Sequence, residues 1–294
     1  MDERQFEEAM DFFNNEEFEE ALDLFKKITE DEVENQDAWF MKALTLINLE
    51  EDERALFAIE KAIDLNPEDI EAWVKKAWIL LLLNDTENGL MAVEKALELD
   101  NNFDDALYLK GRFLVDLGHY QDSIDYFEKY PAQEFLYSDA LFHKGDALYQ
   151  LGKFKEALEC FEAVLKIEPE NPEALNYKGF VLMELQEYNK ARTIFEKALK
   201  SSPGFILPYF NLGIVEKESN NLELSLDLFE KVLKIDPDYY DAWYQKGIVL
   251  NSLNRKEEAL EAYNKVLEIV EKYDMEESEL TVLVKEHIAS LEKK

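Results

Sequence analysis

The sequence predicts an all-α solenoid of helix–turn–helix repeats, and three observations predict it. Small residues recur every 34 residues along almost the whole chain. A second series of small residues follows twelve positions after the first, and four prolines recur at one fixed place in the same period. A fixed period of roughly 20 to 50 residues is the sequence signature of a solenoid that grows by stacking units.

The period divides the chain into eight repeats without an insertion or deletion. Their predicted boundaries are 2–35, 36–69, 70–103, 104–137, 138–171, 172–205, 206–239 and 240–273. Position 8 of the repeat is always Ala or Gly, and position 20 is always Ala, Gly or Ser. Because a mid-helix Gly costs about 1 kcal/mol relative to Ala, its recurrence indicates that two helices approach closely. Large residues at position 24, such as Phe25 and Phe229, fill the adjacent space.

Each repeat is expected to form an A helix over positions ~2–14 and a B helix over positions ~18–31. The turn between them is marked by Gly118-His119, Gly152-Lys153 and Asn220-Asn221. Proline at position 32, as at Pro67 and Pro237, ends the B helix because proline cannot continue a helix. Acidic residues at position 2 lie in the first turn of the A helix, where the helix dipole favours them.

Two segments depart from the pattern. Residues 274–294 carry apolar residues at helical spacing, and we expect a helix there that caps the last repeat. In repeat 104–137, Pro131 falls inside the predicted B helix, which is therefore expected to end early and to change the stacking angle before the next repeat. The segment around Pro131 is either a hinge or a tolerated loop.

Two segments of the last repeat carry a family resemblance. Asp241-Ala242-Trp243-Tyr244-Gln245-Lys246-Gly247 and Ala259-Leu260-Glu261-Ala262-Tyr263 closely match the motif of the tetratricopeptide repeat. The chain resembles this family over all eight repeats. The resemblance implies a right-handed superhelix of helical hairpins and a role in protein binding, but it names no partner, because one scaffold serves many functions.

Composition restricts the class of partner and compartment. The formal net charge is −34, which argues against nucleic acid as the main partner, since phosphate binding depends on Lys and Arg. No apolar stretch approaches the ~20 residues of a membrane span, and the N-terminus lacks the pattern of a signal peptide. The lone Cys160 fits a reducing compartment. We expect a cytoplasmic protein that binds neither nucleic acid nor membrane.

No catalytic pattern is present. The three histidines, His119, His143 and His287, are not at metal-ligand spacing, so no metal site is predicted. No phosphate-binding loop, catalytic triad or dinucleotide motif occurs. Cys160 is interpreted as a structural thiol. The sequence therefore predicts a protein without enzymatic activity and without a cofactor.

In the tetratricopeptide family the A helices line a concave groove, so the resemblance implies groove positions 2, 5, 6, 9, 12 and 13. Nineteen of the 24 residues at positions 5, 9 and 12 are apolar or aromatic. A monomer rarely exposes such a strip unless something covers it. The strip is either a groove for an apolar peptide or partner helix, or it is buried by neighbouring A helices. The candidate groove residues are Phe6, Met10, Phe40, Met41, Leu44, Lys75, Trp78, Leu82, Tyr108, Arg112, Phe142, Asn176, Tyr177, Phe180, Phe210, Asn211, Ile214, Tyr244 and Ile248.

The strongest local candidates are Trp78 and Leu82, because residues 78–83 are apolar around the whole helix. The 48 groove positions hold 12 acids against Lys75, Arg112 and Lys217. The expected ligand is therefore a protein or peptide segment that is apolar with some basic character. The Lys, Asn and Arg set with which the family clamps chaperone tails is not present in consecutive repeats.

The function predicted is a noncatalytic scaffold or adaptor, present as a monomer or a weak homo-oligomer. Two alternatives stay open. The groove could serve self-association in a homo-oligomer, or the chain could be a recruiting subunit of a separate enzyme.

Overall fold

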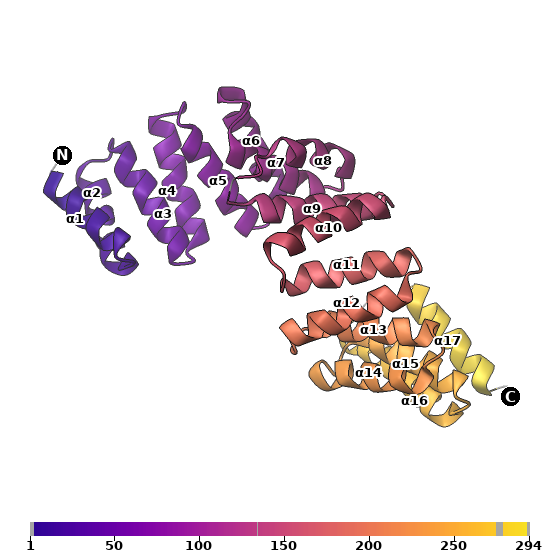
Figure 1. Cartoon of the computed structure of the whole chain (residues 1–294). Helices are drawn as coiled ribbons and strands as arrows, with labels where there is room; N and C mark the ends of the chain where they lie inside the picture. Colours follow the sequence, from indigo (N-terminus) through magenta and orange to yellow (C-terminus); the bar gives the residue numbers. More distant parts are fainter. Residues whose placement is uncertain (1–2, 134, 275–278, 293–294) are drawn as a thin grey trace. The chain divides into compact units, whose positions relative to one another are not determined.

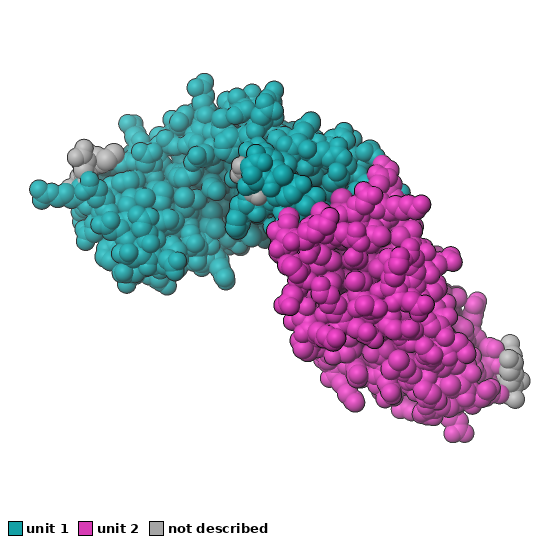
Figure 2. Space-filling model, in the orientation of Figure 1, with its two compact units in different colours: residues 1–151 teal, residues 152–294 magenta. Residues whose placement is uncertain are grey.

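The computed structural model describes residues 3–133, 135–274 and 279–292, and these residues form α-helices and no strand (Figure 1). They belong to two compact units, unit 1 (Met1–Leu151) and unit 2 (Gly152–Lys294) (Figure 2). Asp2, at which the first repeat was predicted to begin, lies outside the described residues. So do residues 275–278 and 293–294 of the predicted C-terminal helix.

Each unit is a series of short helices joined by tight turns. The helices of unit 1 are α1 (Glu3–Asn14), α2 (Phe18–Asp31), α3 (Gln36–Asn48), α4 (Asp52–Leu65), α5 (Ile70–Leu82), α6 (Thr86–Leu99), α7 (Asp104–Asp116), α8 (Tyr120–Lys129) and α9 (Tyr137–Gln150). Those of unit 2 are α10 (Phe154–Ile167), α11 (Pro172–Glu184), α12 (Tyr188–Ser201), α13 (Ile206–Glu218), α14 (Leu222–Ile235), α15 (Tyr240–Ser252), α16 (Lys256–Lys272) and α17 (Glu279–Glu292). Within each unit every helix packs against the next. The predicted all-α repeat solenoid is confirmed.

One backbone feature ends every A helix. The residue at position 15 adopts a positive φ in all eight repeats, which terminates the helix and turns the chain toward the B helix. Glycine occupies it at Gly118 and Gly152, as the sequence indicated. Glu16, Glu50 and Gln186 adopt the same conformation, although side chains of this type disfavour it.

The small residue at position 8 makes room for an aromatic ring of the same hairpin. A Cβ added at Gly179 would lie 2.5 Å from the Phe195 ring, and one at Gly213 would lie 2.7 Å from the Phe229 ring. Both rings are fully buried. The close approach predicted at position 8 is therefore between the A-helix backbone and the position 24 ring of the B helix.

A row of ion pairs joins successive repeats. A Lys at position 7 of an A helix reaches a Glu at position 25 of the preceding B helix, 16 residues earlier in the chain. The pairs are Lys76–Glu60 (2.7 Å), Lys110–Glu94, Lys144–Glu128 (2.8 Å), Lys178–Glu162 (2.8 Å) and Lys246–Glu230 (2.9 Å). Each pair is partly exposed, so each contributes at most about 1 kcal/mol.

The B helix of repeat 104–137 ends early, as Pro131 predicted, because α8 stops at Lys129. Two described residues after α8, Tyr130 and Leu136, make defined contacts. Tyr130 is buried and its ring centroid lies 5.7 Å from that of Tyr108. Its hydroxyl accepts a hydrogen bond from the backbone N–H of Leu136 at 3.3 Å. These contacts favour the interpretation of this segment as a tolerated loop rather than a hinge.

Candidate functional site

The candidate site is the surface formed by the odd-numbered helices from α1 to α15, which are the A helices of the repeats. We call it the A-helix face and define it by positions 2, 5, 6, 9, 12 and 13. A helices contact one another directly within each unit, with α5 against α7 and α7 against α9 in unit 1, and α11 against α13 and α13 against α15 in unit 2. Between α5 and α7 this contact includes the stacked rings of Trp78 and Tyr108.

In unit 1 the face begins with apolar side chains on α1, α3 and α5. Phe6, Met10 and Met41 are half-buried and pack on the core formed by α1, α2 and α3. Phe40 and Leu44 are also half-buried on α3. This part of the face is an apolar surface with limited access to solvent.

The most accessible apolar candidate lies on α5. Leu82 is 52 % exposed, whereas Trp78 is half-buried. The Trp78 ring stacks on Tyr108 of α7, with centroids 5.7 Å apart and planes inclined by 26°. Tyr108 is itself buried, so it packs against Trp78 but is not accessible to a partner. Lys75 is half-buried on the same helix.

A polar cluster interrupts the apolar surface between α7 and α9. The Arg112 guanidinium (Nη1) lies 2.6 Å from His143 Nε2, and its Nε is buried without a hydrogen-bond partner among the described residues. Burial, together with the adjacent Arg112 charge, lowers the pKa of His143 from 6.5 to about 3. His143 is therefore neutral at physiological pH and accepts the hydrogen bond. Phe142 is half-buried next to it.

Two carboxylates lie close to the Arg112 charge. Burial raises the pKa of Asp116 and of Asp146, and Arg112 offsets only part of that effect. Asp146 accepts a hydrogen bond from Gln150 Nε2 at 3.3 Å. A single guanidinium thus lies close to two carboxylates, of which Asp116 is exposed and Asp146 is half-buried, and the formal net charge of the three groups is negative.

In unit 2 the candidate side chains are mostly half-buried. They are Tyr177, Phe180, Phe210, Ile214, Tyr244 and Ile248. Asn176 and Asn211 differ, because both are buried and Asn211 Nδ2 donates to Asn176 Oδ1 at 3.0 Å. Burial raises the pKa of Asp241 at the start of α15.

The structure therefore places the predicted residues on the A helices of the two units, but it does not leave all of them accessible. Tyr108, Asn176 and Asn211 are buried. Neighbouring A helices thus bury part of the strip, and the remaining side chains keep partial access.

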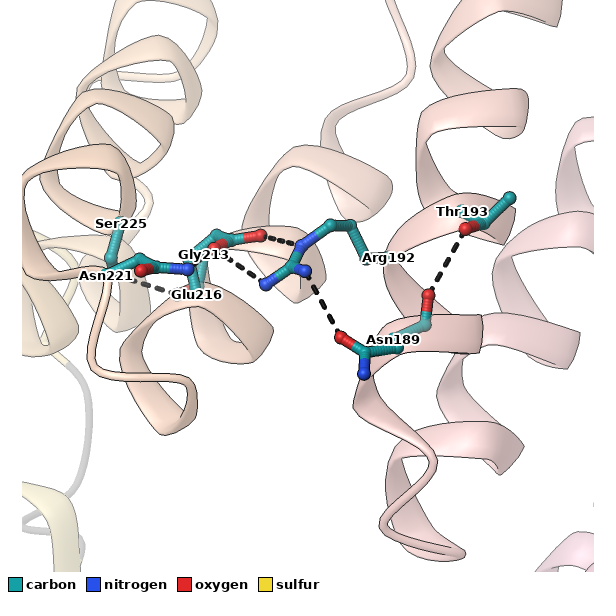
Figure 3. A network of polar contacts seen from close by, with 7 residues as sticks. All are labelled: Asn189, Arg192, Thr193, Gly213, Glu216, Asn221 and Ser225. Atoms are coloured by element: carbon teal, nitrogen blue, oxygen red, sulfur yellow. Dashed lines mark hydrogen bonds and ion pairs between the residues drawn. The ribbon is translucent and has the colours of Figure 1, made fainter.

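One polar network was missed by the sequence analysis. Glu216 on α13 is 1 % exposed and forms an ion pair with Arg192 of α12, with 3.0 Å between Arg192 Nη2 and Glu216 Oε2 (Figure 3). Asn221 Nδ2 donates to the same carboxylate at 2.6 Å. At the corresponding positions, 11 and 21, the other repeats carry apolar residues. Comparing the repeats position by position would have revealed the pair.

None of the helices within residues 3–133, 135–274 and 279–292 is both long and apolar enough to cross a membrane.

Sequence models of known families match several parts of the chain. Models described as tetratricopeptide repeat match residues 6–70, 172–205 and 240–273, and one described as TPR repeat matches residues 145–186. Residues 51–130 match a model of anaphase-promoting complex, cyclosome, subunit 3, and residues 222–253 match the protein prenyltransferase alpha subunit repeat. No curated protein matched the sequence.

Three solved structures are similar to this chain. YrrB, described as a TPR protein with an unusual peptide-binding site, is 28 % identical with a TM-score of 0.54 and covers 64 % of this chain and 97 % of its own. The Cut9–Hcn1 hetero-tetramer of the APC/C is 17 % identical with a TM-score of 0.67 over 93 % of this chain and 52 % of that one. A tetratricopeptide repeat protein from Parabacteroides merdae is 16 % identical with a TM-score of 0.62, and the similarity covers 84 % of this chain and 98 % of that one.

The repeats, the A and B helices and the family matches agree with one another. The tetratricopeptide fold is generally a scaffold for protein–protein interaction. The chain belongs to the tetratricopeptide repeat family.

Proposed function

We propose that the chain is a noncatalytic scaffold that binds a protein segment with apolar and basic residues on its A-helix face. In this proposal eight repeats span residues 2–273, a capping helix spans 274–294, and the protein is cytoplasmic. The observation that supports it most is the partly accessible apolar surface of unit 1, where half-buried Trp78 and exposed Leu82 lie together on α5. Aromatic side chains with this degree of burial are typical energetic centres of protein interfaces.

The apolar part of the ligand would lie against α1, α3 and α5. Side chains there are ordered by packing before any partner arrives, so little conformational entropy is lost on binding. A partner that covered Leu82 and the outer edge of Trp78 would remove apolar area from water at about 25 cal/mol per Å2.

The basic part of the ligand would lie near α7 and α9. Burial raises the pKa of both Asp116 and Asp146, and the single positive charge of Arg112 offsets only part of that effect. A Lys or Arg of the partner would supply the missing positive charge. The formal net charge of −34 would also attract a basic partner over longer distances.

The similarity to YrrB supports peptide binding. YrrB is described as having an unusual peptide-binding site, and 97 % of its chain aligns with this one at 28 % identity. Self-association through the A-helix face predicts a different outcome in the experiment below. Recruitment of a separate enzyme is distinguished by assaying the co-purified partner for activity.

The test compares two double variants of the full chain in pull-downs at matched concentration. Trp78→Glu with Phe142→Glu places charge on the A-helix face. Phe57→Glu with Met91→Glu places the same charge on exposed apolar residues of α4 and α6, which are B helices. Circular dichroism verifies that both variants stay helical.

We expect the first pair to remove partner binding and the second to retain it. Equal binding by both variants, or loss only with the B-helix pair, would contradict the proposal. Sedimentation over a dilution series measures the oligomeric state. Self-association through the A-helix face requires that the wild type forms a dimer and that Trp78→Glu with Phe142→Glu dissociates it. Affinity that falls steeply with salt is expected if Asp116 and Asp146 contact a basic side chain.

A further inference from the structure

The C-terminal helix α17 covers a surface of unit 2 that includes a residue of the A-helix face. Val284 and Leu291 of α17 are buried in the apolar cluster that contains side chains of α15 and α16. His287 stacks on Tyr263 of α16, with ring centroids 5.3 Å apart and planes inclined by 13°. Its Nε2 lies 3.5 Å from the hydroxyl of Tyr244 on α15. We call Tyr244 and Tyr263 the cap seat.

The cap seat contains a polar group that its burial leaves unsatisfied. The Tyr263 hydroxyl is buried and has no hydrogen-bond partner among the described residues. Burial raises the pKa of Tyr263 to about 12. Position 24 of the other seven repeats is Phe, Ile or Val, so this hydroxyl is specific to the repeat that α17 covers.

An unsatisfied hydroxyl destabilises the state in which it is buried and not the state in which water reaches it. The ring of His287 lies flat on the ring of Tyr263, so the seated α17 contributes to this burial. The seat therefore holds α17 less tightly than a Phe at the same position would.

The spacing of the buried side chains shows what the seat accepts. Thr281, Val284 and Leu291 are buried, and Ile288 is half-buried between them, at intervals of three and four residues. Such spacing places these side chains on one stripe of an amphipathic helix. On the other side of the helix Val282 and Leu283 are exposed.

We propose that α17 is an exchangeable occupant of the cap seat, and that an amphipathic helix of another protein with the same apolar spacing binds there in its place. This docking surface goes beyond the function proposed above. Its test measures binding at α15 and α16, so either proposal can fail while the other stands.

The probe is a fluorescent peptide with the sequence of residues 279–292, and the receptor is the full chain. Val284→Asp in the full chain weakens the seated α17, because it would place a charge in an apolar contact. Leu283→Asp adds the same charge at an exposed site and is the matched control. Val284→Ala is a milder second variant. Circular dichroism verifies that each variant is folded.

We expect the Val284→Asp chain to bind the peptide at least about tenfold more tightly than the wild type, since apparent affinity scales with the fraction of open seats. Val284→Ala should be intermediate, and Leu283→Asp should match the wild type. The peptide carrying Val284→Asp should not bind, whereas the one carrying Leu283→Asp should. Tyr263→Phe combined with Val284→Asp should tighten binding further.

The proposal is overturned if the folded Val284→Asp and Val284→Ala chains bind the peptide no better than the wild type. It is also overturned if the peptide carrying Val284→Asp binds as well as the unmodified one, because the contact would then not use the apolar stripe. Hydrogen exchange in the wild-type chain gives a second readout. Excess peptide is expected to speed exchange of the α17 amides, and unchanged rates would contradict exchange at the seat.

Discussion

Replacing Arg192 with Leu is expected to destabilise unit 2 more than most single substitutions would. Glu216 is 1 % exposed, and Arg192 supplies both hydrogen-bonded nitrogens of the ion pair (Figure 3). Without Arg192 the carboxylate stays buried with Asn221 as its remaining hydrogen-bond donor. Removing one partner of a buried ion pair costs about 3–5 kcal/mol, because the other charge is left uncompensated.

The reverse substitution, Glu216→Leu, is expected to cost less. The Arg192 side chain is 28 % exposed, so its guanidinium can reach water when the carboxylate is gone. A cost of about 1–3 kcal/mol follows for the hydrogen bonds lost. If the two effects were independent, the double variant would lose about 4–8 kcal/mol.

The double variant Arg192→Leu with Glu216→Leu is instead expected to be as stable as the wild type, or more stable by up to about 4 kcal/mol. Leucine already occupies both positions at the preceding junction, where Leu158 and Leu182 belong to one apolar cluster. Placing Arg at 158 and Glu at 182 is the matched reverse test, and we expect that variant to be less stable than the wild type.

Urea unfolding followed by circular dichroism measures these differences through the midpoint and slope of the transition. A loss of stability below about 1 kcal/mol for Arg192→Leu would refute the reasoning, since a buried carboxylate without its ion-pair partner should destabilise the fold by more than that. A double variant that is as unstable as Arg192→Leu alone would refute it as well.

Three further predictions rest on individual residues. Glu50→Gly is expected to raise the free energy of unfolding by about 1 kcal/mol because Glu50 has a positive φ of 58°. Gly118→Ala, at the same position of another repeat, is expected to lower it. Urea unfolding that shows no gain for Glu50→Gly and no loss for Gly118→Ala would contradict this. Tyr263→Phe should stabilise the chain by about 1–3 kcal/mol by removing a buried hydroxyl without a partner, whereas a loss of stability would reveal a partner. The pKa of His143 is about 3 in the folded chain and 6.5 when exposed, so between these values the unfolded chain binds more protons at this site. The contribution of His143 to stability should therefore fall as the pH drops from about 6.5 toward 3, and the difference in stability between the wild type and His143→Gln should change over that range; a difference that does not change with pH would contradict this.

Much of the fold could be predicted from the sequence because the same pattern of residues occurs eight times, and each occurrence supports the same assignment of helices and turns. Small residues at position 8 and large ones at position 24 identified a contact that Gly179 and Phe195 make. Pro131 predicted the early end of α8. The turn glycines Gly118 and Gly152 were recognised, but Glu16 and Glu50 in the same conformation were not. There the hydrogen bonds that close the helix end, such as that from the N–H of Glu51 to the carbonyl of Leu46, accompany a positive φ on residues that do not prefer it.

The candidate site was less predictable, since burial depends on how consecutive A helices stack. Position 9 of repeat 104–137 and position 6 of the next repeat meet as Arg112 and His143, and no spacing rule identifies that pair. Tyr108 was chosen for its aromatic ring, yet stacking under Trp78 buries it. Arg192 and Glu216 were readable from the aligned repeats as polar residues at apolar positions.

Site-specific photo-crosslinking tests most directly whether a partner binds the A-helix face. A photoreactive phenylalanine replaces either Leu82, which is 52 % exposed on α5, or Met91, which is 64 % exposed on α6 of the same repeat. The account predicts that the partner crosslinks at position 82 and not at position 91. Crosslinking at position 91 without any at position 82 would contradict it.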